Sequence, residues 1–473
     1  MNLIGISSEL FLSILSLLIL SFSVFMSEKY ATRFSNRFAL LGILICIPLV
    51  YFTNNSSGSI FLNSYIYDHL SQFTKILILL GTLFTLVISY KSLKNEGIDF
   101  PEFPVLIIFS VIGMLLMTSS NDLITMYMAI ELQSLPLYIL AALKRDNLKS
   151  TEAGLKYFVL GALSSGILLY GMSLVYGSVG STMFYDISIS INEEISLTLL
   201  IGIIFILSGL AFKISAVPFH MWTPDVYEGA PTSVTTFFAI VPKIAAITLL
   251  IRICHSSFGN IFDQWQQIII FISILSMLLG SVAAIFQTNI KRLIAYSSIA
   301  HVGFALVGLA AGNDLGLASV LIYMTIYVFM NIAAFCIILS LKRDGQFVEE
   351  IEDLSGLFKY QPFLAISFLV ILFSMAGIPP LAGFFGKWMI FSSAVNSGLI
   401  YLAIIGVLSS VIGAFYYIRL IKIMFFDEIY SEIDKLDNRA LLITLYLMTF
   451  IIITFGIYLN WFYDISIFVT SSI

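Results

Sequence analysis

Four ionisable residues fall inside long apolar stretches of the sequence, where a charge is costly: Glu131, Lys213, Lys243 and Lys387. A lysine at the centre of a membrane helix costs roughly 2.5 to 3.5 kcal/mol on insertion scales, so such residues usually mark a functional site. Titratable groups in a row are what proton transfer across a membrane requires. These residues therefore predict a proton path. The alternative is a structural ion pair that only specifies packing.

The depth of these residues supports that prediction. Glu131 lies ten residues into the span predicted over 121–143, which is about 15 Å along a helix axis and near the midplane. Lys243 lies a similar distance into the span that begins near Ser233, and Lys213 lies beside an interruption of its span. A buried Glu131–Lys213 pair would be bistable, because each partner favours the charged form of the other while burial opposes it. Lys243 is predicted to be the central station and Lys387 the site in the second half.

Three further residues are candidate relays. His301 lies near the middle of a predicted span and His220 follows a helix interruption, so either could pass a proton near neutral pH. A lone histidine in a helix is, however, often a packing residue. Lys156 lies near the end of its span and could extend to the membrane surface, but it is kept as a candidate. Lys75 is expected to extend to the surface and is left out of the path.

Composition indicates an integral membrane protein. The chain has 473 residues, of which 59% are hydrophobic and 11% charged, and its mean hydropathy is +1.01. Apolar runs long enough to cross the hydrocarbon recur between short polar gaps. We therefore predict an all-α polytopic membrane protein with about fourteen transmembrane helices. The three cysteines are dispersed and predict neither disulfides nor a metal site.

The basic residues predict an orientation. Most of the 23 lysines and arginines flank the loops that follow odd-numbered spans. By the positive-inside rule these loops are cytoplasmic, which leaves both termini on the periplasmic side.

Two five-helix units follow one another in the sequence, spans 4–8 and spans 9–13. An odd number of helices repeated in tandem must insert upside down the second time, so we predict inverted repeats. The fourth span of each unit is interrupted, at Ser215–His220 and at Gly377–Gly383. The predicted segments are an N-terminal three-helix segment (1–103), the first repeat (104–255), the second repeat (256–428) and a last span (429–473). Aligning the interruptions places Lys213 before one break and Lys387 after the other.

The sequence lacks the motifs that mark other common activities. The sequence contains no phosphate-binding glycine loop, no histidine-rich metal motif, no nucleophile elbow and no basic arm for nucleic acid.

Four long motifs carry a family resemblance: Glu131–Gly171, Phe219–Thr232 (FHMWTPDVYEGAPT), Ile290–Phe304 (IKRLIAYSSIAHVGF) and Ala376–Trp388 (AGIPPLAGFFGKW). They closely resemble the antiporter-like membrane subunits of bacterial respiratory complex I, the proton-translocating NADH:quinone oxidoreductase, and among these the subunit N family. The resemblance extends over essentially the whole chain. It implies fourteen helices, two inverted repeats and a proton path.

The same resemblance implies roles for residues. Glu131 matches the family's fifth-helix glutamate, Lys213 its partner lysine, Lys243 the central lysine and Lys387 the lysine of the second broken helix. Lys156 and His220 match ionisable positions along the path. The sibling subunit M carries glutamate where this chain has Lys387, which favours subunit N.

The resemblance also implies the surroundings. This chain would bind no cofactor or metal; NADH, FMN, iron–sulfur clusters and quinone would lie on partner subunits. Its partners would be the other membrane subunits, including the other antiporter-like ones, and the lipid bilayer, without nucleic acid. The location would be the bacterial inner membrane rather than the mitochondrial inner membrane. Two alternatives stay open, namely a subunit of a multisubunit cation/proton antiporter that works without NADH, and a structural scaffold.

Overall fold

The protein is a bundle of long helices. The computed structural model describes residues 3–53, 57–191, 196–430, 432–435 and 438–471. Within these residues the strands form two small antiparallel hairpins, β1 (Gly58–Ile60) with β2 (Tyr65–Tyr67) and β3 (Lys342–Arg343) with β4 (Gln346–Phe347).

The α-helices are α1 (Ser7–Val24), α2 (Glu28–Thr53), α3 (His69–Glu96), α4 (Glu102–Ser119), α5 (Leu123–Ala141), α6 (Leu148–Val179), α7 (Phe184–Ser190), α8 (Leu197–Lys213), α9 (Trp222–Gly229), α10 (Thr232–Arg252), α11 (Phe262–Ile285), α12 (Ile290–Ala310), α13 (Asp314–Ile338), α14 (Leu357–Tyr360), α15 (Pro362–Ala376), α16 (Ala382–Asn396), α17 (Ile400–Phe426), α18 (Arg439–Thr454) and α19 (Leu459–Thr470). Short 3₁₀ segments cover Leu3–Ile6, Gly259–Ile261, Ile351–Leu354 and Phe455–Tyr458, and a π-helical turn covers Ile253–Ser257.

The predicted number of spans is confirmed. In the described part of the chain, twelve helical segments are long and apolar enough to cross a membrane, and two shorter apolar helices, α8 and α15, are the first halves of the interrupted spans. The second halves are α9 and α16. Together these make fourteen spans, with a broken helix in the fourth place of each five-helix unit.

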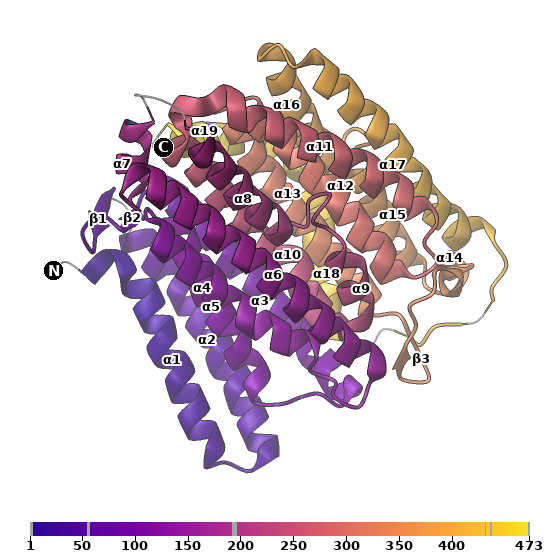
Figure 1. Ribbon diagram of the computed structural model, residues 1–473. Coiled ribbons are helices and arrows are strands. Elements are labelled where there is room, and N and C mark those ends of the chain that lie inside the picture. The colour runs from indigo at the N-terminus through magenta and orange to yellow at the C-terminus, as the bar shows by residue number, and fades with distance from the viewer. Residues whose placement is uncertain (1–2, 54–56, 192–195, 431, 436–437, 472–473) are drawn as a thin grey trace.

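The centre of the bundle is formed by α10, α12 and α13. Every residue of α10 is buried, and nearly every residue of α12 and α13. Figure 1 shows α1 and α2 at one side of the bundle and α17 at the opposite side. Both chain ends lie at the end of the bundle that holds β1 and β2, whereas α9, α14 and β3 lie at the other end. A helix that is apolar all round is expected at such a central position.

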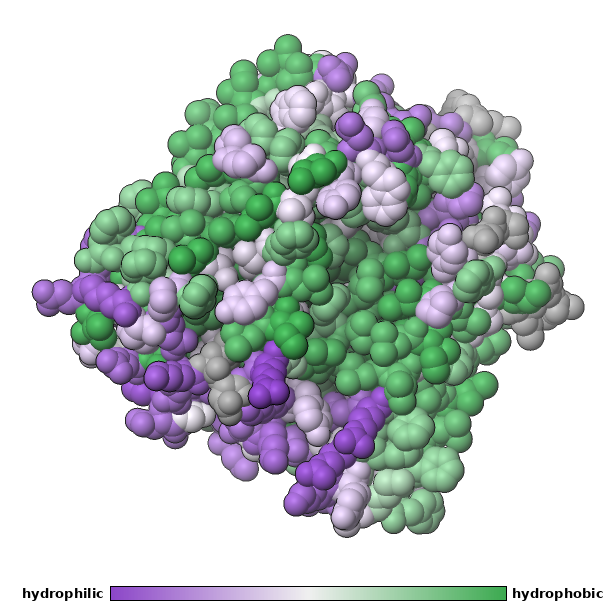
Figure 2. Space-filling model, turned by 180° about the vertical axis from the view of Figure 1, so that it is seen from behind, coloured by the Kyte–Doolittle hydropathy of each residue, from purple (hydrophilic) through white to green (hydrophobic). Residues whose placement is uncertain are grey.

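The surface has the pattern of a membrane protein. In Figure 2 hydrophobic residues cover a broad band, and hydrophilic residues gather toward two opposite ends. Many large apolar side chains are exposed along the outer helices, for example Leu163 in α6, Val411 in α17 and Ile443 in α18. Lipid tails are the environment that suits such a band.

Matching helix starts support the predicted repeat. The Asp122 side chain caps α5, the second helix of the first unit, by accepting hydrogen bonds from the N–H groups of Ile124 and Thr125. Asn289 caps α12, the second helix of the second unit, by accepting from Lys291 and Arg292. An acceptor at this position satisfies amide groups that a helix leaves free at its start.

Two glycines set the same close helix contact in both units. A Cβ added to Gly113 of α4 would collide with the backbone nitrogen of Gln133 in α5. A Cβ added to Gly280 of α11 would lie 2.6 Å from the backbone nitrogen of Ala300 in α12. Small residues allow such close backbone approach in membranes.

We expect Gly280→Val to reduce the amount of this chain in membranes, because α11 and α12 must separate to admit the side chain. Overpacking of this kind typically costs about 1–3 kcal/mol. Immunoblotting of membranes would measure the loss. Gly177→Val is the matched control, because a Cβ at Gly177 meets nothing within 4 Å. Equal amounts of both variants would contradict the close contact.

Candidate functional site

Lys213 and Glu131 lie on neighbouring helices but do not form a direct ion pair. Lys213 is the last residue of α8, and its ammonium donates a hydrogen bond to Ser134 Oγ over 2.8 Å. Ser134 lies one turn after Glu131 in α5 and donates in turn to the carbonyl of Ile130. Glu131 Oε1 is buried without a hydrogen-bond partner among the described residues, and the glutamate charge still acts on Lys213. The expected Glu131–Lys213 pair is therefore not a direct contact. Ser134 is the hydrogen-bond partner of Lys213, and the charge of Glu131 acts on the lysine without a hydrogen bond.

The interruption that follows Lys213 is held by fixed polar contacts. Ser215 adopts a left-handed backbone conformation with φ of 64°, which a residue other than glycine adopts only where its surroundings impose it. The N–H of Val217 donates to Ser276 Oγ of α11 over 2.9 Å, and the Trp222 indole donates to the carbonyl of Phe212 over 3.1 Å. These contacts satisfy backbone groups that a break would otherwise leave unpaired inside a membrane.

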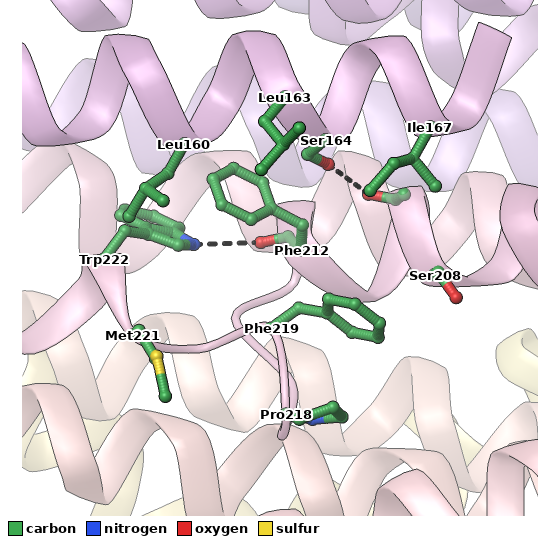
Figure 3. Close-up of a pocket in the computed structure, with 11 residues that line it drawn as sticks. Leu160, Leu163, Ser164, Ile167, Ser208, Phe212, Pro218, Phe219, Met221 and Trp222 are labelled. Atoms are coloured by element: carbon green, nitrogen blue, oxygen red, sulfur yellow. Dashed lines mark hydrogen bonds between the residues drawn. The ribbon is translucent and has the colours of Figure 1, made fainter. Parts of the chain in front are cut away.

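A pocket of about 160 Å³ opens beside this interruption. Figure 3 shows Phe212 and Phe219 turned toward it, together with Leu160, Leu163 and Ile167 from α6. Its lining is mostly apolar, so it offers few groups that could carry a proton.

Lys243 occupies the centre of the bundle. It is 1% exposed, and its ammonium donates a hydrogen bond of 2.5 Å to Ser298 Oγ of α12. The Tyr227 ring lies 5.6 Å from the ammonium. Pro242, inside α10, has no N–H to offer the carbonyl of Phe238, and the Tyr227 hydroxyl donates to that carbonyl instead. The ammonium of Lys243 therefore has one hydroxyl partner and an aromatic ring beside it.

His301 has two tyrosine partners. Its Nδ1 is 2.6 Å from the Tyr323 hydroxyl and its Nε2 is 3.2 Å from the Tyr417 hydroxyl. The charges of both Lys243 and Lys387 act on its ring. The structure thus brings His301 into the row, and the tyrosines extend it with hydroxyls that can donate and accept.

Lys387 lies against the end of a half helix. Its ammonium donates to the carbonyls of Met375 and Ala376 over 3.0 and 3.1 Å, and to Ser410 Oγ over 2.8 Å. These carbonyls end α15, and the carboxyl end of a helix carries partial negative charge. Lys213 also stands at the carboxyl end of a half helix. The two lysines come from opposite sides of their breaks, as predicted, but both lie where a first half helix ends.

The residues that interact with the lysines occupy equivalent positions in the two five-helix units. Glu131 and Ser298 each lie nine residues after the helix caps Asp122 and Asn289. By the same count Ser134 corresponds to His301. The second unit therefore has a hydroxyl where the first has a carboxylate, and an imidazole where the first has a hydroxyl.

Lys156 is not part of the buried row. Its side chain is 41% exposed and forms ion pairs with Glu152 over 2.8 Å and with Asp225 over 2.9 Å. Asp225 also pairs with Arg292, which reaches Glu228 as well. This cluster joins α6, α9 and α12 at the end of the bundle that holds β3.

His220 lies within the interruption and is 8% exposed. Its Nδ1 has no hydrogen-bond partner among the described residues. This nitrogen could therefore still form a hydrogen bond, but no hydrogen bond in the described part of the chain links His220 to Lys213 or Lys243.

The expectation that Lys75 extends to the membrane surface is wrong. Its side chain is 0% exposed and forms an ion pair of 2.7 Å with Glu9 of α1. A buried carboxylate neutralises the charge, so the side chain gains nothing by reaching the surface. A second buried pair joins Arg252 to Asp68 over 2.9 Å. The sequence feature that could have indicated this burial is Glu9, because it is an acidic residue within an apolar run.

The row consists of two groups. Glu131, Ser134 and Lys213 form the first, and Lys243, His301 and Lys387 with their hydroxyl partners form the second. Among the described residues no hydrogen bond joins the two groups, and none joins Lys243, His301 and Lys387 to one another; the charges of both lysines act on His301, which is why the three are grouped. Within the described ranges no cluster of three or more histidine, cysteine or acidic residues could hold a metal ion.

The family model and the curated relatives indicate the same family. Residues 120–413 match the family described as NADH:quinone oxidoreductase/Mrp antiporter. NADH-quinone oxidoreductase subunit N of Rhodospirillum rubrum is 54% identical over 441 residues, which cover 92% of this chain and 90% of that protein. The subunit N of Pelagibacter ubique is 51% identical and covers 97% of both chains.

Solved structures agree in fold. A chain of respiratory complex I from Thermus thermophilus with bound aureothin matches with a TM-score of 0.80 and 30% identity, covering 96% of this chain and 98% of that one. A chain of the Mrp complex from Dietzia sp. matches with a TM-score of 0.87 at 20% identity, covering 100% and 97%. At that identity the second likeness speaks for the fold alone.

Proposed function

This chain belongs to the NADH-quinone oxidoreductase subunit N family, and from that premise we propose that it translocates protons through its buried row of glutamate, lysines and histidine. The observation that carries the proposal is the second group, in which His301 has a tyrosine hydroxyl at each ring nitrogen and the charges of Lys243 and Lys387 act on its ring. These groups can each take up and release a proton.

We further propose that the chain carries no redox centre. NADH oxidation, FMN, iron–sulfur clusters and quinone reduction would reside on partner subunits, and the other antiporter-like membrane subunits would be its neighbours. The end of the bundle with β3 and α9 would face the cytoplasm and both termini the periplasm, because basic residues such as Lys144, Arg145 and Lys342 lie there. The four predicted segments (1–103, 104–255, 256–428, 429–473) belong to this proposal.

A polar cavity supports uptake from the proposed cytoplasmic side. It has a volume of about 410 Å³ and is lined by residues that include Glu96, Lys291 and Glu349. Ser233, in the first turn of α10, donates a hydrogen bond of 2.7 Å to Glu96. The cavity thus reaches the start of the helix that carries Lys243.

The alternative is that this chain is a subunit of a cation/proton antiporter that works without NADH, since the chain shares its fold with a subunit of the Mrp complex. Purification of the tagged chain from bacterial membranes in mild detergent distinguishes the two. We expect flavin and iron–sulfur absorbance and NADH:quinone reductase activity to co-purify with it, and an untagged strain is the control. A stable complex that lacks both cofactors and exchanges cations for protons would contradict the proposal.

A further inference from the structure

A second set of buried charges lies outside the row, at the end of the bundle that holds both termini. Lys75 Nζ of α3 is 2.7 Å from Glu9 Oε1 of α1 and donates to the Tyr65 hydroxyl over 2.7 Å. The Tyr65 hydroxyl donates to Glu9 Oε1 over 2.8 Å. The other carboxylate oxygen accepts from Ser8 over 2.6 Å. The three groups Glu9, Tyr65 and Lys75 thus form a closed triangle, and none is more than 2% exposed.

We propose that Glu9, Tyr65 and Lys75 form a proton-exchange site between the row and the aqueous phase at the end of the bundle where the chain termini lie. This inference rests on the proposed function, since it assigns a further site to the same transport. The three residues come from α1, β2 and α3, so only the folded N-terminal segment brings them together.

The position of the triangle suits an outlet. Glu9 lies in the first turn of α1, where the 3₁₀ segment before it carries the exposed Ile4. One helical turn rises only about 5.4 Å, so the carboxylate is close to the end of the span. Figure 1 shows α1 starting next to β1 and β2, at the end of the bundle where the chain terminus also lies.

A second ion pair connects the triangle to the central helix. Arg252, the last residue of α10, pairs with Asp68 and donates to the carbonyl of Thr118 over 3.0 Å. Its charge acts on Tyr65. Lys243 lies on the same helix, nine residues earlier. Arginine stays protonated in proteins, so Arg252 does not carry the proton; its partner Asp68 caps the start of α3, the helix that carries Lys75.

The proposed step balances in atoms and charge. The Tyr65 hydroxyl gives its proton to the Glu9 carboxylate and takes one from the Lys75 ammonium, which leaves a carboxylic acid and an amine, both neutral. The acid then releases its proton to the aqueous phase, and the amine takes up the next proton from the protein interior. In a buried site the charged and neutral forms of such a pair are closer in energy than in water, because burial penalises the charged form.

The competing explanation is that the pair only ties α1 to α3. Breaking one partner of a buried pair is strongly destabilising, whereas removing both charges is often tolerated. The informative variants are therefore Glu9→Asp, which keeps a titratable group, Glu9→Gln, which removes it, and the double variant Glu9→Gln with Lys75→Met, which removes both charges. Glu28→Gln, an exposed carboxylate at the opposite end of the α1–α2 hairpin, is the control.

The test uses the whole complex in membrane vesicles. Proton translocation per NADH oxidised is measured together with the amount of assembled complex. We expect Glu9→Gln to lower the amount of assembled complex, because it leaves Lys75 unpaired, and the double variant to assemble and to lower translocation per complex about twofold or more, while Glu9→Asp and Glu28→Gln retain it. Normal translocation per complex in the double variant would overturn the proposal. So would failure of the double variant to assemble, since that assigns the pair to folding.

Lys243→Met, measured in parallel, separates this inference from the proposed function. Normal translocation in Lys243→Met overturns the proposed function itself. Loss of translocation in Lys243→Met with normal translocation per complex in the double variant overturns only the exchange site.

Discussion

Lys243→Met is expected to abolish proton movement through this chain without removing the chain from the membrane. Methionine has a similar length and no charge, so it fills the space in α10 while offering no proton acceptor. Ser298 keeps a partner, because its hydroxyl also donates to the carbonyl of Ala295 over 2.7 Å. Replacing a buried cation with an apolar side chain of similar volume is often neutral for stability.

Loss of a proton-transfer group slows a step by roughly 10²-fold or more. In vesicles that contain the whole complex, NADH-driven acidification per complex should therefore fall, and immunoblotting should show near-normal amounts of the chain. Lys422→Met is the matched control, because Lys422 is mostly exposed and pairs with Asp427 at the membrane end. Full acidification in Lys243→Met would refute the central role of this lysine.

Glu131→Gln is expected to have the second-largest effect. Glu131 Oε1 has no hydrogen-bond partner in the described part of the chain, so the amide breaks no visible contact and changes little besides the charge. Lys213 then loses the negative charge that acts on it and keeps only its hydrogen bond to Ser134. The affinity of Lys213 for a proton should change, and with it transfer through the first group.

The measurement is proton translocation per NADH oxidised, compared with Glu102→Gln, which alters an exposed carboxylate at the start of α4. We expect a loss of about tenfold in translocation through this chain for Glu131→Gln and none for Glu102→Gln. If Glu131→Ala and Lys243→Ala combined left translocation complete, the row would not be the path.

The division of the row into two groups has a consequence for the mechanism. The first group ends at Lys213 and the second begins at Lys243, so the proposed path requires a proton to cross between them. In the sequence, the break between α8 and α9 lies between these two lysines. There Trp222 stacks on Tyr157, with ring centroids 4.3 Å apart, while Tyr157 also contacts Phe238 of α10.

The sequence by itself determined the architecture and the identity of the central residues. Span length and hydropathy are local properties, so fourteen spans, two interruptions and the mid-depth positions of Glu131, Lys213, Lys243 and Lys387 could be read from the order of residues. The prolines at the interruptions, Pro218 and the pair Pro379–Pro380, remove backbone donors there, although Pro136 and Pro242 stand inside continuous helices.

The tertiary structure alone decided the partners of these residues. Which side chain faces which depends on the rotation of each helix about its axis, and that rotation is set by packing between segments far apart in the sequence. Lys213 therefore binds Ser134 rather than Glu131, and Lys387 reaches back to the carbonyls that end α15. The burial of Lys75 could not be predicted for the same reason. Its depth in α3 was visible in the sequence, but its burial depends on Glu9 and Tyr65, which reach it only in the folded chain.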